Sequence, residues 1–155
     1  MTVSIFPMCR EHIGEMAELE QICFSMPWSY NMLSDELTNE YAVYYVAELD
    51  GRVVGYAGIH MLFDAGHITN VAVSPQHRRK GIASALIDTI LRIADKSGLE
   101  SITLEVRQSN DAAVSLYSSK GFIPVAERKN YYNKPVESAI LMQRTKEKQT
   151  VFQNI

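Results

Sequence analysis

The spacing of apolar residues changes several times along the chain, and each change marks a new structural element. Short runs rich in β-branched residues predict strands at 3–6, 42–49, 52–61, 66–73, 102–106, 122–126 and 138–143. Apolar residues three and four positions apart predict helices at 10–24, 80–96 and 109–120. Ser29 follows the interruption at Pro27-Trp28 and is a typical N-cap residue, so a further short helix is expected to end near residue 37.

The apolar stripe of each long helix predicts the face that is buried. In the helix at 10–24 this stripe consists of Ile13, Met16, Leu19 and either Ile22 or Cys23. In the helix at 80–96 it consists of Ile82, Leu86, Ile90 and Ile93.

The order of the elements predicts one α/β domain, with a mixed central sheet and helices on both of its faces. Asp50 and Gly51 separate two predicted strands and are a strong signal for a two-residue hairpin. The helix at 80–96 joins two strands in the manner of a parallel crossover. We expect the domain to span residues 1–144 and a polar tail to follow at 145–155.

Composition narrows the class of protein. A chain of 155 residues, 46% of them hydrophobic, suits one globular domain with a sizeable core. No apolar run approaches the ~20 residues of a membrane span, and no signal peptide is evident, so a cytoplasmic location is expected. Cys9 and Cys23 form no Cys-x-x-Cys pair and are expected to be free thiols in or near the core. The histidines lack metal-ligand spacing, so no metal is expected and they are interpreted as surface or strand residues: His12, His60, His67 and His77.

The net charge of −3 is unevenly distributed along the chain. Residues 1–50 contain one cationic and nine acidic side chains, whereas residues 51–155 contain fourteen and nine. A solvated acidic helix face would give this asymmetry, and so would a surface that attracts a cationic substrate. The basic residues form no long stripe, so direct binding of nucleic acid is not expected.

A short basic turn at residues 74–84 joins a predicted strand to a predicted helix. Three consecutive cationic residues at 78–80 and then Gly81 precede the helix. Free backbone N–H groups at a helix N-terminus, the helix dipole and nearby cationic side chains all favour a phosphate or pyrophosphate ligand. The spacing fits neither the P-loop nor the dinucleotide-binding glycine pattern. A solvated, basic helix N-terminus is the alternative interpretation.

The turn has the form Arg78-x-x-Gly81-x-Ala83, which resembles the acetyl-CoA pyrophosphate loop of the GCN5-related N-acetyltransferases. Four more segments agree with it: Pro27-Trp28-Ser29, Leu104-Glu105-Val106-Arg107-Gln108-Ser109-Asn110, Ala113-Val114-Ser115-Leu116-Tyr117-Ser118-Ser119-Lys120-Gly121-Phe122 and Arg128-Lys129-Asn130-Tyr131-Tyr132. Together, over residues 5–142, these segments resemble the ribosomal-protein-alanine N-acetyltransferase family of that superfamily.

This resemblance implies a sheet whose fourth and fifth strands splay apart around the pantetheine arm of acetyl-CoA. The implied cofactor contacts come from the fourth strand, the turn with the start of the helix, and a residue on the other side of the arm: Val71, Ala72, Val73, Arg78, Arg79, Lys80, Gly81, Ile82, Ala83, Ser84 and Asn110. Trp28, Tyr131 and Tyr132 are expected to shape the groove for a peptide.

The resemblance places a general base at Glu105 and a general acid at Tyr117. An amine must lose a proton before it attacks a thioester, and a carboxylate can accept that proton directly or through water. The leaving thiolate has a pKa near ~8.5, so a phenol can donate to it at the end of the reaction. By alternation alone, Glu105 would be an outward-facing strand residue, and by its helical spacing Tyr117 would be a packing residue.

The acceptor that the resemblance implies is the N-terminal alanine of a small-subunit ribosomal protein, whose basic N-terminal segment would suit the acidic first fifty residues. An α-ammonium group, with a pKa near ~8, is easier to deprotonate than lysine by roughly 3 kcal/mol. The alternatives are a lysine side chain or a small polyamine as acceptor, and a CoA-binding module without catalysis. Two positions depart from the family pattern, since Ala83 replaces a frequent glycine and Ala65 stands where many relatives carry an acidic residue.

Overall fold

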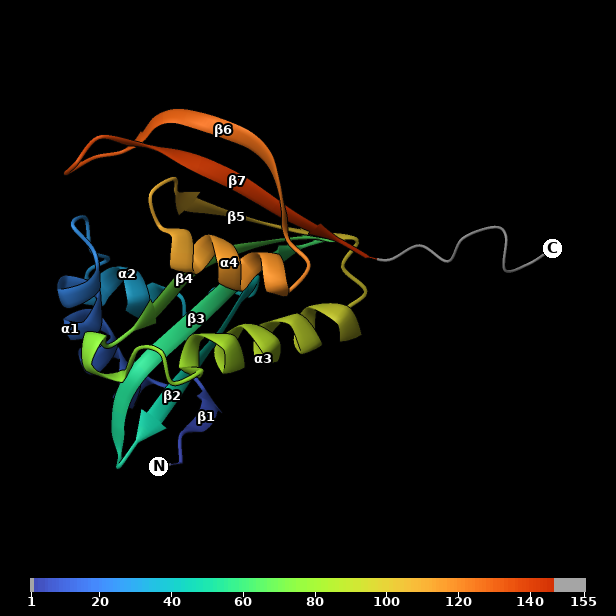
Figure 1. The fold of residues 1–155 in the computed structure, drawn as a ribbon. Helices are drawn as coiled ribbons and strands as arrows, with labels where there is room; N and C mark the ends of the chain where they lie inside the picture. The colour runs from blue at the N-terminus through green and yellow to red at the C-terminus, as the bar shows by residue number, and fades with distance from the viewer. Residues whose placement is uncertain (1, 147–155) are drawn as a thin grey trace.

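The computed structural model describes residues 2–146, and its seven strands form one sheet (Figure 1). The strands are β1 (Ser4–Pro7), β2 (Ala42–Leu49), β3 (Arg52–Leu62), β4 (Ala65–Val73), β5 (Ser101–Arg107), β6 (Ile123–Tyr132) and β7 (Glu137–Thr145). They lie in the order β1-β2-β3-β4-β5-β7-β6. Neighbouring strands are antiparallel except for β4 and β5, which are parallel. The expected mixed sheet is therefore confirmed.

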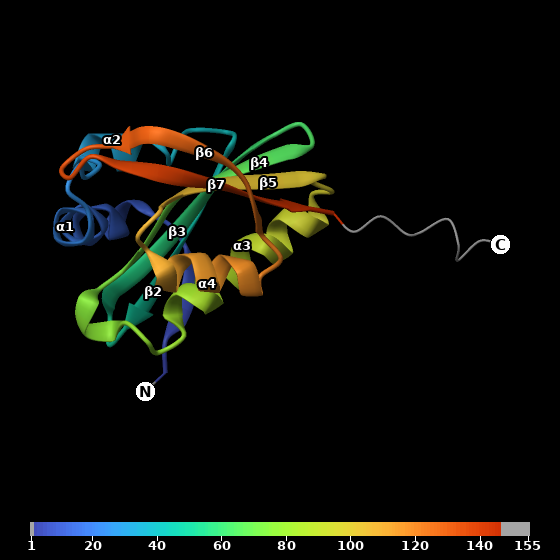
Figure 2. The ribbon, with the colours of Figure 1, turned by 45° about the horizontal axis from the view of Figure 1, so that its top comes forward.

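Helices lie on both faces of this sheet, as expected (Figure 2). They are α1 (Ile13–Cys23), α2 (Tyr30–Asp35), α3 (Ile82–Lys96) and α4 (Asp111–Ser119), with short 3-10 turns η1 (Arg10–His12) and η2 (Pro75–His77). Helices α1 and α2 form one core with β2–β4, whereas α3 and α4 pack in a second core on the opposite face. Helix α3 connects β4 to β5 as a parallel crossover. No helix within residues 2–146 is long and apolar enough to cross a membrane.

The buried faces of α1 and α3 agree with the apolar stripes except near their ends. On α1, Ile13 and Met16 are fully buried, but Ile22 is 64% exposed and Cys23 is the partly buried residue of that pair. The buried face of α1 also includes an acid, Glu20, which is 1% exposed. On α3 Ile93 is only half-buried, because the face that meets the sheet also takes in residues beside the stripe: Ile87, Leu91 and Ala94.

Two predicted helix starts are confirmed by hydrogen bonds at their N-caps. Ser29 Oγ accepts a hydrogen bond from the Met32 backbone N–H at 3.1 Å, at the start of α2. Asn110 Oδ1 accepts one from the Ala113 backbone N–H at 3.1 Å, at the start of α4. Each cap pairs an N–H group that would otherwise have no acceptor within its helix.

The last two strands are longer than the hydrophobic pattern predicts. Strand β6 was expected to end at residue 126 and instead reaches Tyr132, because pairing with β7 continues through two irregular positions. As an edge strand it is almost wholly exposed, so its outer half carries no alternating apolar signal. Strand β7 passes the expected domain end at 144, since Thr145 pairs with Ser101. The rest of the expected tail, residues 147–155, lies outside the described residues.

Strands β4 and β5 separate soon after they begin, as expected for this fold (Figure 1). Their parallel pairing consists of the three matches Ala65 with Ser101, Gly66 with Ile102, and His67 with Thr103. On its other side β4 stays paired with β3 as far as Val73, with a bulge that leaves Thr69 as the extra residue. Beyond His67 the edge of β4 that faces β5 is therefore free of a partner strand within residues 2–146.

A glycine in β3 leaves room for a tyrosine ring in the middle of this sheet. A Cβ atom added to Gly58 would lie 2.1 Å from the Tyr44 ring, which is buried. We expect Gly58→Ala to lower the free energy of unfolding by about 1–3 kcal/mol, since the ring must move out of a packed core. Gly14→Ala in α1 meets nothing within 4 Å and is the control. It should raise stability by up to ~1 kcal/mol. Urea unfolding of the parent and of both variants measures these free energies. Equal free energies of unfolding for Gly58→Ala and Gly14→Ala would contradict the packing of the Tyr44 ring against Gly58.

Candidate functional site

The loop after β4 presents backbone N–H groups at the start of α3. Gly81 is the N-cap of α3 with φ of +79°, and Arg79 also has a positive φ of +63°. Within residues 2–146 no side chain caps this helix, and its first backbone bond runs from Ala85 N–H to the Gly81 carbonyl. The N–H groups of the first turn are thus free of intrahelical acceptors. This arrangement can hold the oxygens of an anion.

The side chains expected in this loop fall into three groups. Arg78 turns back on the loop, where Nε donates to the Val73 carbonyl at 3.1 Å and a terminal nitrogen lies 3.7 Å from Cys23 Sγ. Arg79 and Lys80 are exposed, so they can contribute positive charge from solvent. Ile82 is buried in the core, so only its backbone can reach a ligand, whereas two small residues of the first turn are half-buried: Ala83 and Ser84.

The conformation of Gly81 provides a direct test of this anion site. We expect Gly81→Val to raise the KM for acetyl-CoA at least 10-fold, because a branched side chain would stand where a phosphate approaches the backbone. Gly98→Val is the matched control, since Gly98 follows the other end of α3 with φ of +76° and its added Cβ also meets nothing within 4 Å. Both variants carry the same backbone strain. Steady-state kinetics that give the two variants equal KM values would contradict the loop assignment.

The expected contacts for the pantetheine arm lie at the free edge of β4 and at the start of α4. Ala72 and Val73 are buried and Val71 is half-buried. A ligand at this edge of β4 can therefore hydrogen-bond to their backbone N–H and C=O groups, but it has little access to their side chains. Asn110 uses Oδ1 as the cap of α4, which leaves its amide N–H groups for a ligand.

A cavity of about 200 Å³ lies where β4 and β5 have separated. Its wall includes Thr69 and Asn70 of β4, Arg107 of β5 and Tyr132 of β6. The rest of the wall comes from α1 and the segment before α2: Glu20, Cys23, Phe24, Ser25, Met26, Trp28 and, from the β6–β7 turn, Asn133. Trp28 and Tyr132 thus lie together in the cavity wall. Tyr131 lies outside it, 48% exposed, with its ring 5.0 Å from that of Tyr132.

Arg107 makes hydrogen bonds to segments on both sides of this cavity. Its guanidinium donates to Glu137 Oε1 at 3.2 Å and to the carbonyls of Pro135 and Asn133 at 3.1 Å. It also donates to Ser25 Oγ at 3.4 Å and lies 4.4 Å from the centre of the Tyr132 ring. The β6–β7 turn and the segment before α2 are therefore fixed against the end of β5.

Glu105 lies on β5 with its side chain on the same face as Arg107, as the alternation predicted. Leu104 and Val106 are 2% and 5% exposed, on the core face. The Glu105 carboxylate is 12% exposed and pairs with His67 Nε2 at 2.9 Å and Arg128 Nε at 3.5 Å. His67 was expected to be a strand residue and is one, but its contact with Glu105 was not foreseen. Its Nδ1 also lies 2.8 Å from Thr103 Oγ1, which fixes the ring.

Tyr117 lies in α4 and is 8% exposed, with its ring 6.0 Å from that of Phe122. Burial, with a smaller effect from Tyr132, raises the pKa of Tyr117 to about 12. The hydroxyl therefore stays protonated at neutral pH and can donate a hydrogen bond. The packing interpretation and the donor interpretation of Tyr117 are compatible in this position.

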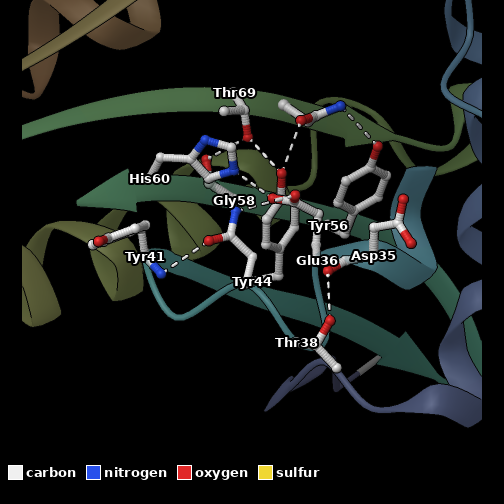
Figure 3. A network of polar contacts seen from close by, with 11 residues as sticks. Asp35, Glu36, Thr38, Tyr41, Tyr44, Tyr56, Gly58, His60 and Thr69 are labelled. Atoms are coloured by element: carbon white, nitrogen blue, oxygen red, sulfur yellow. Dashed lines mark hydrogen bonds and ion pairs between the residues drawn. The ribbon is translucent and has the colours of Figure 1, made fainter. Parts of the chain in front are cut away.

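A buried polar network that the sequence did not reveal reaches the β4 wall of the cavity, and Figure 3 shows its members Tyr44, Tyr56 and Thr69. The Tyr44 hydroxyl lies 2.7 Å from Thr69 Oγ1 and donates to Asn70 Oδ1 at 3.3 Å. Asn70 Nδ2 lies 3.2 Å from the Tyr56 hydroxyl and 3.1 Å from Glu20 Oε1. The signal that could have identified Glu20 is its place on the apolar face of α1, four residues after Met16.

Comparisons with known proteins show the family of this chain. Residues 13–122 match the profile of the Acetyltransferase (GNAT) family. Over 133 residues the chain is 36% identical to a Bacillus subtilis protein named as a candidate ribosomal protein bS18-alanine N-acetyltransferase. This alignment covers 85% of this chain and 88% of that protein. Over 114 residues it is 32% identical to the ribosomal protein bS18-alanine N-acetyltransferase of Escherichia coli, covering 74% and 76% of the two chains.

Two solved structures share the fold of this chain over nearly its whole length. The ribosomal-protein-S18-alanine N-acetyltransferase from Escherichia coli superimposes with a TM-score of 0.87 at 27% identity, over 96% of this chain and 97% of that one. Ard1 from Thermoplasma volcanium gives a TM-score of 0.85 at 26% identity, over 96% and 100%.

Proposed function

Because this chain belongs to the Acetyltransferase (GNAT) family and is an acetyl-CoA-dependent N-acetyltransferase, we propose that it acetylates the N-terminal alanine of a small-subunit ribosomal protein. The proposal rests on the cavity between the separated strands β4 and β5. Thr69 and Asn70 form the β4 part of its wall, and they are followed directly by Val71–Val73 and by the basic loop at 74–81. The relatives named above act on ribosomal protein bS18, or are named as candidates for that activity, and supply the substrate class. The reaction would take place in the cytoplasm.

The residues of the loop and of β4 fit acetyl-CoA. Free N–H groups at the start of α3 suit its pyrophosphate, and the unpaired edge of β4 can hydrogen-bond to an extended arm. When bound there, the thioester supplies the activated acetyl group. The first residue of a peptide would enter the cavity from the side of α1 and Tyr132.

Glu105 would act as the base for the attacking amine. Its carboxylate lies on the cavity face of β5, two residues before Arg107, which is part of the cavity wall. It can accept a proton from the α-amine directly or through water. His67 and Arg128 occupy its oxygens in this structure, so an incoming amine or water must compete with them.

Tyr117 would donate to the sulfur of the leaving group. A phenol with a pKa of about 12 would have to transfer its proton uphill to a thiolate of pKa ~8.5, by roughly 5 kcal/mol. A hydrogen bond from the Tyr117 hydroxyl to the thiolate does not carry this cost and still stabilises the charge as it forms. The hydroxyl is thus better suited to hydrogen-bond donation during bond cleavage than to an early, complete proton transfer.

The decisive experiment compares acceptors directly. The protein is incubated with acetyl-CoA and peptides that begin with alanine, serine, glycine or methionine, or that carry a blocked N-terminus and an internal lysine. Mass spectrometry then locates the acetyl group. We expect the alanine peptide with a basic following segment to be acetylated at its α-amine with the highest kcat/KM. Preferential acetylation of lysine or of a polyamine would overturn the proposed acceptor, and cofactor binding without any transfer would favour a non-catalytic module.

A further inference from the structure

One carboxylate in the cavity wall has a hydrogen-bond donor on only one of its two oxygens. Glu20 Oε1 accepts hydrogen bonds from the Trp28 backbone N–H at 3.3 Å and from Asn70 Nδ2 at 3.1 Å. Glu20 Oε2 is buried and has no hydrogen-bond partner within residues 2–146. The whole side chain is 1% exposed, and burial raises its pKa. A buried acceptor without a donor lowers stability, so its presence needs an explanation.

The surrounding residues hold this carboxylate in one orientation. Asn70 is fixed by the hydroxyls of Tyr44 on β2 and Tyr56 on β3, in the same sheet as Asn70. Trp28 is fixed by the start of α2, where Ser29 caps the helix. Glu20 is therefore held in one orientation in the cavity wall.

The cations near the cavity do not serve as donors to Glu20. Arg107, the one cationic residue in the described cavity wall, directs its guanidinium to Glu137, two carbonyls and Ser25. Arg78 donates to the Val73 carbonyl. A molecule that enters the cavity can supply a donor to Glu20 Oε2, and an ammonium group would supply both a hydrogen bond and the opposite charge.

We propose that Glu20 binds the α-amino group of the substrate's first residue in this cavity. The assignment rests on the proposed function. The wall also contains Trp28, whose aromatic ring can lie beside a cation. A cavity of about 200 Å³ also favours a small first side chain over a large one. Glu20 is a binding and specificity residue here, and Glu105 remains the proposed base.

A chemical double-mutant cycle tests this contact. Two peptides are compared on the CoA-saturated protein by calorimetry: one begins with alanine, and the other carries a propionyl group in its place and so differs only in lacking the amine. We expect Glu20→Gln to weaken binding of the alanine peptide about 10-fold or more, and of the propionyl peptide less than 2-fold. Glu18→Gln removes the same charge from an exposed position on α1 and should change neither.

Further measurements separate binding from folding. Glu20→Gln keeps an oxygen for the Trp28 and Asn70 donors, so its Tm and its affinity for CoA should match those of the parent. Glu20→Asp keeps the carboxylate and should recover part of the lost affinity. The effect should fall on the KM for the peptide more than on kcat.

Several outcomes would overturn the assignment. Equal weakening of both peptides by Glu20→Gln would mean that Glu20 shapes the cavity without contacting the amine. A parent protein that binds the propionyl peptide as tightly as the alanine peptide would exclude the contact, whatever the variant does. If the parent and Glu20→Gln both acetylate alanine peptides with the same KM, Glu20 does not bind the substrate amine, and the proposed function still stands. A parent that acetylates no alanine peptide would overturn both.

Discussion

Replacement of Glu105 by glutamine is expected to lower kcat for an alanine peptide by about 10²-fold or more near pH 7, where most of the α-amine is protonated. The variant keeps the size of the side chain and its place on β5 but removes the proton acceptor. The loss should shrink as the pH rises above ~8, because free amine then becomes abundant without a base. The ratio of parent to variant rates is measured between about pH 6.5 and 9.5 with saturating peptide.

The shape of this pH profile separates three roles for Glu105. A ratio that stays large at every pH would mean that Glu105 positions the amine and is not the base. A ratio near one throughout would remove it from the mechanism. Glu100→Gln is the control, since Glu100 is exposed just before β5 and its loss should leave kcat unchanged.

Tyr117→Phe is expected to lower kcat by about 10²-fold, with little change in the KM for acetyl-CoA, because the ring still packs on Phe122 while the hydroxyl is lost. Burial places the pKa of Tyr117 at about 12, so the hydroxyl is protonated throughout the accessible range. The parent-to-variant ratio should therefore stay constant between about pH 6.5 and 9.5, unlike the ratio for Glu105→Gln.

A matched control for Tyr117 is available just before β2. Tyr41 is 48% exposed and lies outside the cavity wall, so Tyr41→Phe should change kcat less than about 2-fold. Equal kcat values for the parent protein and Tyr117→Phe would mean that Tyr117 contributes to packing and not to the reaction. A lower Tm in Tyr117→Phe together with weaker acetyl-CoA binding would show that the hydroxyl supports the fold and not the reaction.

Local signals in the sequence determined most of the elements and the anion loop. Ser29 and Asn110 are cap residues whose side chains pair the first N–H groups of a helix, and both helices start where these residues predict. Gly81 precedes α3 in the left-handed conformation that favours glycine. Such features depend on a few neighbouring residues, which is why the chain itself reveals them.

The composition of the cavity was decided by tertiary structure. Glu20, Asn70 and Arg107 are far apart in the chain and meet only because α1 covers β4 while β5 diverges from it. No spacing rule relates them. The contact between His67 and Glu105 likewise follows from the register of β4 with β5, which hydrophobic alternation leaves open.

The sequence by itself thus determined the order and type of the elements, the cap residues, the basic loop and the outward face of Glu105, because each depends on local backbone geometry or on a period of two or 3.6 residues. Only the tertiary structure decided how far β6 and β7 extend, where β4 and β5 separate, and which acid on α1 is buried in the cavity wall. These features depend on strand pairing and on burial between distant segments, and their free energy is set by contacts that no local pattern records.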